Sequence, residues 1–382
     1  MANYDYEIVN GRKIRVRPKE TVSEIDKNGY FRRQPNHFTT PFGDGENDLK
    51  AEGNKRYRLV WAKLCHWSNR AAIVRELEGL EDQISVNMVE HAPHEKNLGW
   101  EYVYNENNID PVLGDQFLSE AYYRADDDYQ GRTTVPALID TTTGKVVNND
   151  YNWLTTYFEV NFRPWHKKGA PELYPVELRE EIDKMNLWLF DNINNAVYRS
   201  SFSRSNEGHF DGVNTFYAAM DRLEKRLETN RFIFGDYVTD SDIRLYVTLA
   251  RLDIRYTTQL GETKRPLYTY KNLWGYAKEL WEIPAFAHHT DFAAIIRQGR
   301  IEGEEDGFRA STHYDLALPK IDWDAQWKVS TERAYLPSDP THPIYLGNNR
   351  RFDIDPTWYD LGAESPKKEE KETPPSCGCC CG

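Results

Sequence analysis

Cysteine is scarce along most of this chain of 382 residues, because Cys65 is the only cysteine before residue 377. A fold stapled by disulfides needs paired cysteines, so the body of the chain cannot be one. A lone thiol in a chain without an export signal is typical of a reducing compartment, where cysteines stay free. We therefore expect a cytoplasmic protein in which Cys65 is a free thiol.

Long apolar runs and an excess of basic residues are also missing. No stretch of ~18 consecutive apolar residues occurs, and the first residues lack the basic and apolar regions of a signal peptide. The chain has 48 Lys and Arg against 61 Asp and Glu, a formal charge of −13. Binding of nucleic-acid phosphates needs a clustered basic face. We expect no membrane or nucleic-acid partner and predict small-molecule ligands.

The first half of the chain predicts an α/β domain. Residues 57–62 alternate like a strand, residues 69–80 have apolar positions at helical spacing, and residues 84–89 again resemble a strand. A polar insertion follows, and then residues 133–148 predict a hairpin with its turn at 141–144. The order of strand, Cys65 turn, helix, strand and hairpin is that of a β-α-β unit extended by two strands.

The second half predicts an all-α domain. Four segments have apolar residues at a spacing near 3.6, and Thr239 with Asp242 forms a capping box at the start of the third. These segments are 178–192, 215–228, 240–256 and 272–281. We expect six parts in all: an irregular arm (1–54), the α/β domain (55–150), a linker (151–175), the helical domain (176–301), an extension (302–361) and a disordered Cys-rich tail (362–382).

Cys65 is expected at the start of the first helix. Unpaired backbone N–H groups and the positive end of the helix dipole favour a thiolate there. Ser68 stands three residues on, where a second cysteine would be needed for an internal disulfide, so Cys65 would act as a monothiol nucleophile. His66 adds a titratable group that could stabilise the thiolate or shift it with pH. The alternative is a buried, unreactive cysteine.

Several motifs resemble those of one enzyme family over roughly residues 28 to 300. They are Gly29-Tyr30-Phe31-Arg32-Arg33, Cys65-His66-Trp67-Ser68-Asn69-Arg70, Leu98-Gly99-Trp100-Glu101-Tyr102, Asp110-Pro111-Val112-Leu113-Gly114, Gly131-Arg132-Thr133-Thr134-Val135-Pro136, Asn195-Ala196-Val197-Tyr198-Arg199 and the stretch 234–245. On these residues the chain resembles the glutathionyl-hydroquinone reductases, the Xi-class branch of the glutathione transferases, which is close to the omega class.

The resemblance implies a fold, a reaction and an assembly. The N-terminal half would be thioredoxin-like and the C-terminal half a helical transferase domain, in a homodimer. Family enzymes use the cysteine to remove glutathione from a glutathionyl-hydroquinone, which leaves a mixed disulfide that a second glutathione resolves. The cosubstrate would be glutathione or another low-molecular-weight thiol, the partners that thiol and its conjugate, and the core would hold no metal.

The resemblance also assigns roles to residues. Cys65, Tyr198 and His66 would be catalytic, with Tyr198 donating a hydrogen bond to the aromatic substrate's oxygen. Trp100 would pack on the thiol ligand, and Val135, before a cis-proline, would pair its backbone with the ligand's cysteinyl part. The predicted thiol-binding residues are Trp100, Arg132, Val135, Pro136, Asp150 and Tyr151.

The chain departs from the family pattern at three places. The proline after the cysteine is His66, and the family's Asn-Glu-Ser reads Asn149-Asp150-Tyr151. Asp150 can still accept from an ammonium group, although it is one methylene shorter, and Tyr151 replaces a small hydroxyl by a phenol. The family's His-Tyr-Tyr falls at 298–300, which reads Gln-Gly-Arg. The identity of the thiol and of the acceptor is therefore open.

Four cysteines crowd the last six residues, at Cys377, Cys379, Cys380 and Cys381. Close thiolates suit soft metals such as Cu(I) or Zn(II). They could instead be acylated, resolve a mixed disulfide at Cys65, or be inert. Two rivals to the transferase remain from the sequence: a non-catalytic thiol- or metal-binding protein with the tail as its metal site, and an enzyme that uses Cys65 for reductive dehalogenation or ether cleavage.

Overall fold

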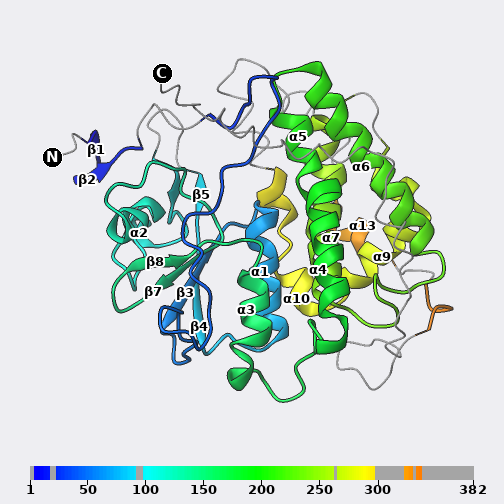
Figure 1. Cartoon of the computed structure of the whole chain (residues 1–382), viewed down its shortest axis with the longest axis horizontal. Coiled ribbons are helices and arrows are strands. Elements are labelled where there is room, and N and C mark those ends of the chain that lie inside the picture. Colours follow the sequence, from blue (N-terminus) through cyan, green and yellow to red (C-terminus); the bar gives the residue numbers. More distant parts are fainter. Residues whose placement is uncertain are drawn as a thin grey trace, which may run out of the picture.

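A four-stranded mixed sheet forms the centre of the N-terminal half of the computed structural model (Figure 1), which describes residues 4–17, 23–91, 98–261, 265–296, 322–329 and 333–337. The strand order is β4-β3-β7-β8, with β3 and β4 parallel and the other neighbours antiparallel. This is the thioredoxin-like arrangement that the family resemblance implies. The bounds are β3 (Tyr57–Trp61), β4 (Ile84–Met88), β7 (Ala137–Asp140) and β8 (Lys145–Asn148).

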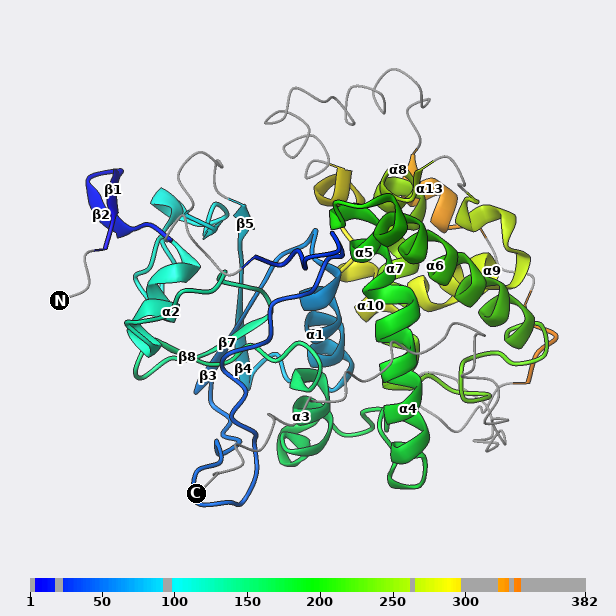
Figure 2. The same cartoon turned by 45° about the horizontal axis from the view of Figure 1, so that its top comes forward.

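The two faces of the sheet bury different helices, because successive side chains of a strand point to opposite faces. Leu59 and Leu138 pack with the core shared by α1 (His66–Leu77) and α3 (Leu154–Val160), whereas Val60 packs with α2 (Leu118–Ala125). All five residues of β3 are buried. The sheet is thus covered on both sides, and α1 lies between it and the helical half (Figure 2).

Two of these helices are not predicted from the sequence. The helix α3 lies in the stretch 151–175 that was expected to be a linker, and it forms because Leu154, Phe158 and Phe162 recur every four residues and are buried together. The helix α2 lies in the stretch expected to be a polar insertion, which also contains the short strands β5 (Glu90–His91) and β6 (Trp100–Glu101).

The C-terminal half consists of helices packed beside α1. All four predicted helices are present, although α6 begins nine residues before 215 because Ser205 caps it by accepting the Gly208 N–H at 3.2 Å. The helices are α4 (Arg179–Leu189), α5 (Ala196–Phe202), α6 (Asn206–Arg226), α7 (Asp240–Arg251), α8 (Thr257–Gln259), α9 (Lys271–Trp281) and α10 (Pro284–His288), with π-helical turns η5 (Phe190–Asn194) and η6 (Leu252–Tyr256).

The capping box predicted at the start of α7 is confirmed. Asp242 Oδ2 accepts from the Thr239 N–H at 2.8 Å and from the Thr239 hydroxyl at 3.0 Å. Short 3-10 turns connect the longer elements at Glu106–Asn108, Arg163–Trp165, Val176–Leu178 and Leu267–Thr269. Among the helices of the described residues, none is both long and apolar enough to cross a membrane.

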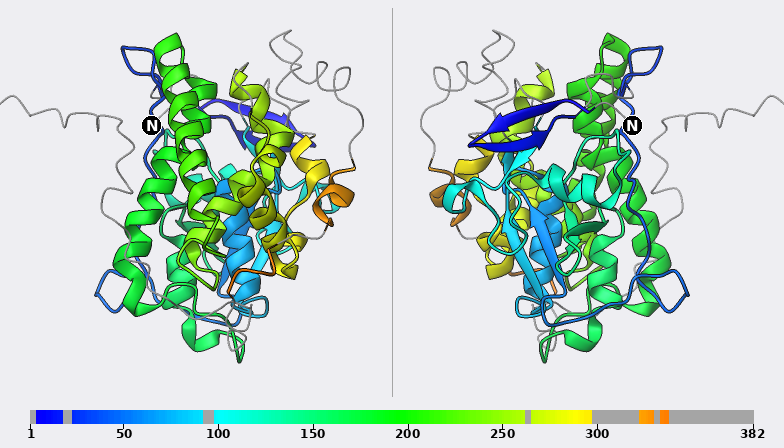
Figure 3. Two further views of the ribbon diagram at one scale, coloured as in Figure 1. Left: turned by 90° about the vertical axis from the view of Figure 1, so that its right-hand side faces the viewer. Right: turned by 90° about the vertical axis from the view of Figure 1, so that its left-hand side faces the viewer.

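The arm, defined as residues 23–54, runs from the helical half across to the sheet (Figures 1 and 3). Gly29 O accepts from the Arg204 N–H at 2.7 Å, and the Phe31 N–H donates to Ser203 Oγ at 3.0 Å. Further along, the Asn149 N–H donates to Phe38 O at 2.9 Å. The arm therefore touches both halves of the molecule and crosses the junction between them.

Before the arm, a hairpin replaces the irregular structure expected at the N-terminus. The strands β1 (Tyr6–Val9) and β2 (Arg12–Arg15) are antiparallel and are joined by Asn10 and Gly11, with φ of 49° and 78°. An Asn-Gly pair is the strongest short hairpin signal, since both residues tolerate positive φ.

A short piece of the extension is docked on the helical half. The helix α13 (Trp323–Trp327) places the buried ring of Trp327 edge-on to Trp274, with centroids 5.1 Å apart. Arg333 is also buried and forms an ion pair with Glu279 at 3.2 Å.

Candidate functional site

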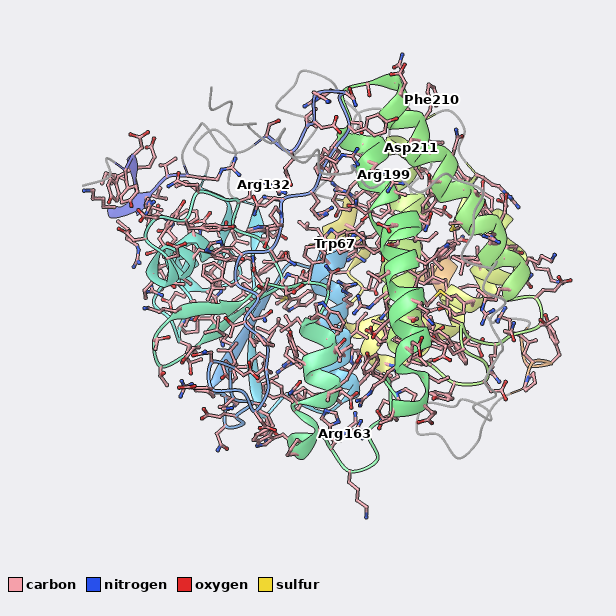
Figure 4. All side chains as sticks on the ribbon, in the orientation of Figure 1. Trp67, Arg132, Arg163, Arg199, Phe210 and Asp211 are labelled. Atoms are coloured by element: carbon pink, nitrogen blue, oxygen red, sulfur yellow. The ribbon has the colours of Figure 1, made fainter. Side chains whose placement is uncertain are left out.

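A cavity of about 500 Å³ opens where the arm, the sheet half and the helical half meet, and Cys65 lies on its wall. Figure 4 shows Trp67 at the start of α1, in the middle of the molecule, and Arg132 toward the sheet half beside the arm. The lining includes Glu24, Phe31, Arg33 and Gln34 from the arm; Cys65, Trp67, Trp100, Arg132, Val135 and Tyr151 from the sheet half; and Tyr198, Phe202, Arg255 and Tyr256 from the helical half.

Cys65 is the N-cap residue of α1 and is partly buried. Its Sγ lies 3.8 Å from the carbonyl oxygen of Val135, so the thiol donates a weak hydrogen bond across the cavity floor. The Ser68 hydroxyl does not reach the sulfur, because it binds the backbone of Ala62 at 3.1 Å (N) and 3.2 Å (O) and the Cys65 carbonyl at 3.3 Å. Ser68 fixes the turn while the sulfur faces the cavity.

Three of the predicted thiol-binding residues lie on the sheet side of the cavity. The peptide bond between Val135 and Pro136 is cis, as the resemblance implies, and Val135 lines the cavity. Trp100 donates from Nε1 to Thr133 O at 3.1 Å, which orients its ring. Arg132 Nη2 forms an ion pair with Glu24 Oε1 at 2.8 Å. Pro136 is not among the lining residues.

Asp150 and Tyr151 are placed differently from each other. Asp150 is buried outside the cavity, where Oδ1 accepts from Asn36 Nδ2 at 2.9 Å and from the Asn152 N–H at 3.0 Å. Tyr151 does line the cavity, and its ring packs against Trp67 with centroids 4.7 Å apart. The phenol of Tyr151 therefore lies at the cavity wall, whereas the carboxylate of Asp150 lies outside the cavity.

An aromatic wall faces Cys65 from the helical half. It is built from Tyr198, which is partly buried, and Tyr256, which is buried, and their ring centroids are 6.4 Å apart. Burial raises the pKa of Tyr198 above its usual 10.0, and burial together with Tyr198 raises the pKa of Tyr256 well above that value. Both phenols therefore stay protonated at neutral pH and can donate hydrogen bonds into the cavity.

His66 lies behind this wall and not beside the sulfur. Its Nδ1 is 3.0 Å from the Tyr256 hydroxyl and 3.3 Å from the Thr248 hydroxyl. Burial first, and then the guanidinium groups of Arg251 and Arg33, lower the pKa of His66 well below its usual 6.5. The ring is therefore neutral at pH 7. In the structure the ring contacts Tyr256 and Thr248, and a role of His66 in stabilising the thiolate stays a prediction of the sequence.

The neutral ring of His66 predicts a pH effect on stability. Because its pKa is lowered by folding, the unfolded chain binds the proton more tightly below pH 6.5, and stability falls on acidification by up to about 1.4 kcal/mol per pH unit. Denaturant unfolding at pH 7.5 and 5.5 should show that His66→Gln loses about 1 kcal/mol less than the wild type over this interval. Equal losses would mean that the folded ring accepts a proton freely.

Arg251 holds the turn that carries Cys65, although no sequence motif points to it. This fully buried side chain extends from α7, donating to Leu64 O (Nε), Lys63 O (Nη2) and Val247 O (Nη1), each at 2.8 Å. A fourth bond joins Nη1 to Asn69 Oδ1 at 3.2 Å. The helical half thus fixes the backbone just before the thiol.

The arm also supplies residues that the sequence does not assign to the site. The side chain of Gln34 forms two hydrogen bonds with the backbone of Arg132. Its Oε1 accepts from the Arg132 N–H at 2.9 Å, and its Nε2 donates to the Arg132 carbonyl at 3.2 Å. Arg33 enters the cavity between two aromatic rings. The motif at residues 29–33 marks the arm as a family feature, but the sequence does not show that Phe31 and Arg33 line the cavity; the folded chain does.

Other sequence predictions concern metals and the family's last motif. Within the part of the chain that the structure describes, no three or more His, Cys, Asp or Glu side chains are arranged to hold a metal ion. The tail cysteines and residues 298–300 lie outside the described residues.

Comparisons with known proteins agree on one family. The sequence model described as "Glutathione S-transferase, C-terminal domain" matches residues 197–279. A glutathione S-transferase omega-like 2 of Schizosaccharomyces pombe is 34% identical over 279 residues, covering 70% of this chain and 88% of that protein. A glutathionyl-hydroquinone reductase of Escherichia coli is 33% identical over 240 residues, covering 63% of this chain and 73% of that protein.

Solved structures give the same result. The glutathione-bound structure of that Escherichia coli protein superimposes with a TM-score of 0.66 at 30% identity, covering 78% of this chain and 96% of the other. The Xi glutathione S-transferase of Phanerochaete chrysosporium gives 0.64 at 33% identity, covering 71% of this chain and 87% of the other.

Proposed function

Because the chain belongs to the glutathionyl-hydroquinone reductases, the Xi-class and omega-like branch of the glutathione transferases, we propose that it is a thiol-dependent reductase of aromatic thioether conjugates with Cys65 as nucleophile. The observation that carries this proposal is the position of Cys65 Sγ in the cavity, 3.8 Å from the carbonyl of Val135 and opposite the tyrosine wall. A thiol with this access can attack the sulfur of a ligand whose aromatic part rests on Tyr198 and Tyr256.

The proposed reaction is a thiol exchange in two steps. The ring carbon that bears the sulfur takes up a proton while a ring hydroxyl loses one, which gives the dienone form of the conjugate. The Cys65 thiolate then attacks the sulfur, the bond between sulfur and this carbon breaks, and its electron pair passes to the ring oxygen, which takes up a proton, so that the aromatic compound is reduced to the quinol. A mixed disulfide between Cys65 and the thiol remains. A second thiolate attacks this disulfide and leaves as the oxidised low-molecular-weight disulfide, which restores the Cys65 thiolate.

The tyrosine wall would stabilise the transition state of the first step. As the bond to sulfur breaks, negative charge develops on the quinol oxygen, and a phenol that stays protonated donates a hydrogen bond to it. Tyr198 is the proposed donor, with Tyr256 beside it and His66 behind Tyr256 at 3.0 Å. Both hydroxyls are held by packing, so little reorganisation is needed during the reaction.

Trp100, Arg132 and Val135 are the proposed contacts of the thiol cosubstrate. They lie on the sheet side of Cys65, where the Val135 backbone can pair with the cysteinyl part of a peptide thiol. Glutathione is the first candidate because the relatives carry its name. Asp150 and Tyr151 change the end of the site where the family binds the γ-glutamyl group, so we propose weaker binding of that group here.

The thiol part of this proposal can be tested at Tyr151. In Tyr151→Ser the phenol that packs on Trp67 is removed and a small hydroxyl returns, so the KM for glutathione should fall roughly three- to tenfold, the value of about one hydrogen bond. Tyr151→Phe, which keeps the ring, should leave that KM unchanged. Steady-state rates at varied glutathione would measure both, and a raised KM in Tyr151→Ser would show that the phenol contributes to binding.

The reaction itself can be tested with a defined conjugate. The protein is incubated with 2-glutathionyl-hydroquinone and reduced glutathione, and the products are separated by chromatography. Hydroquinone and glutathione disulfide should appear in equal amounts. Turnover of a chlorinated hydroquinone with release of chloride, without turnover of the conjugate, would instead support reductive dehalogenation.

A cytoplasmic homodimer remains a prediction of the sequence and of its resemblance to the family. Light scattering would measure the oligomeric state, and cell fractionation would measure the localisation.

A further inference from the structure

Among the described residues that line the cavity, basic side chains outnumber acidic ones. Five arginines line it, and Glu24 is the one acidic residue among the described lining residues. Glu24 is already paired with Arg132 at 2.8 Å. A cavity of this kind attracts anions, since guanidinium groups in a partly desolvated site interact strongly with carboxylates and similar groups.

Arg33 is the arginine on the aromatic side of the cavity. Its guanidinium carbon lies 4.5 Å from the ring centroid of Trp67 and 4.4 Å from that of Tyr198. Nε donates to Asn195 Oδ1 at 3.0 Å, so three contacts fix the plane of the group. The guanidinium is therefore preorganised next to the tyrosine that we propose as hydrogen-bond donor to the substrate.

No carboxylate compensates this charge within the described part of the chain. Arg33 forms no ion pair there, and its Nη2 is buried without a hydrogen-bond partner. Stacking on aromatic rings fixes a guanidinium but does not satisfy its N–H groups. A buried donor without an acceptor costs free energy, and an acceptor brought by a ligand would remove that cost.

The other arginines divide between the two sides of Cys65. Arg17 and Arg132 lie on the sheet side, with Glu24 near both of them. Arg255 lowers the pKa of Tyr198 together with Arg33, although burial raises it more, which places Arg255 on the aromatic side. Arg204 lines the cavity near the arm, where its backbone binds Gly29. The positive charge thus extends over the aromatic side as well as the thiol side.

Resting on the proposed function, we infer that the aromatic substrate is anionic and that its ring carries a carboxylate or sulfonate, which Arg33 binds from its place over Trp67 and Tyr198. The ring would fill the apolar part of this side, which Phe31 and Phe202 complete. Neutral hydroquinone conjugates would be poorer substrates, because they bring no anionic acceptor to the guanidinium.

A matched pair of ligands tests this inference without turnover. Isothermal titration calorimetry compares 4-hydroxybenzoate with the isosteric neutral 4-hydroxybenzamide. The wild type should bind the carboxylate about tenfold more tightly than the amide, and Arg33→Gln should reduce this ratio to about one while leaving the amide affinity unchanged. Arg32→Gln is the control, because Arg32 is exposed, pairs with Asp26 and does not line the cavity; it should keep the tenfold ratio.

Two results would overturn the inference. One is equal binding of the two ligands by the wild type. The other is a preference that disappears in Arg132→Gln and survives in Arg33→Gln, which would place the anion on the thiol side. Kinetics then separate the inference from the proposed function: turnover of the glutathionyl conjugates of hydroquinone and 2,5-dihydroxybenzoate with equal kcat/KM refutes the inference alone, whereas turnover of neither, with Cys65 unmodified, refutes the proposed reaction.

Discussion

Replacing Cys65 by serine should reduce turnover of a glutathionyl-hydroquinone by about 1,000-fold or more, the loss expected when a nucleophile of covalent catalysis is removed. A hydroxyl at this position is not ionised near neutral pH and cannot form a disulfide with the conjugate. The fold should survive, because the thiol is partly buried and, among the described residues, its one polar contact is the 3.8 Å contact to Val135 O. Thermal unfolding should therefore show a midpoint close to that of the wild type.

The same variant separates the enzyme from the binding protein that the sequence alone leaves open. Ligand affinity should be retained in Cys65→Ser while the rate is lost, since the cavity walls are unchanged. Equal rates in wild type and variant would mean that another group does the chemistry. The tail cysteines are present in both proteins, so they are an internal control for unspecific thiol exchange.

Removing the guanidinium of Arg251 should lower the free energy of unfolding more than the other substitution proposed as a test of stability, His66→Gln. Arg251→Met retains much of the aliphatic volume but leaves the carbonyls of Leu64, Lys63 and Val247 without their 2.8 Å donors. The free energy of unfolding should fall by about 3–5 kcal/mol, as when one partner of a buried polar group is removed. The turn before Cys65 should loosen as well, so kcat/KM should drop by more than the folded fraction explains.

Arg333→Met is the matched control for that result. Arg333 is also buried and binds backbone carbonyls, those of Leu227, Asn230, Arg231 and Asn272, at 2.8–3.2 Å, but these lie on the helical half away from the cavity lining. It should lower stability and leave the kcat/KM of the folded protein unchanged. If both variants lose activity only in proportion to stability, Arg251 is a structural residue and does not position Cys65.

The spacing of apolar residues predicted the helices and strands that bury one face, and the strand β3, which is buried along its whole length. The strand at 57–61, the hairpin at 137–148 and the four long helices are all present because their apolar residues recur at the period of the element. The hairpin at Asn10-Gly11 was missed although its turn signal was there, because the strands beside it are short and half exposed. The helix α3 was missed although Leu154 and Phe158 stand at helical spacing, because a helix of 7 residues offers too few periodic positions to distinguish it from a connecting segment.

Site residues could be predicted from the sequence only where they belong to a short motif that resembles the family. Cys65, Trp100, Arg132, Val135, Tyr151 and Tyr198 were named from the sequence and do line one cavity, while Pro136, Asp150 and His66 lie behind its wall. Tyr256, Arg251 and Arg33 could not be assigned, because their roles arise from contacts between segments far apart in the chain. The neutral state of His66 likewise depends on arginines brought near it by folding.

Peptide mass spectrometry after a single turnover tests the central claim most directly. The reduced protein is mixed with an excess of 2-glutathionyl-hydroquinone without free glutathione, quenched with acid and alkylated, and each cysteine peptide is examined. One glutathionyl group should appear on the Cys65 peptide, with one equivalent of hydroquinone released, and both should be absent in Cys65→Ser. Release of hydroquinone with Cys65 unmodified, or a glutathionyl group on the tail cysteines alone, would contradict the role proposed for Cys65.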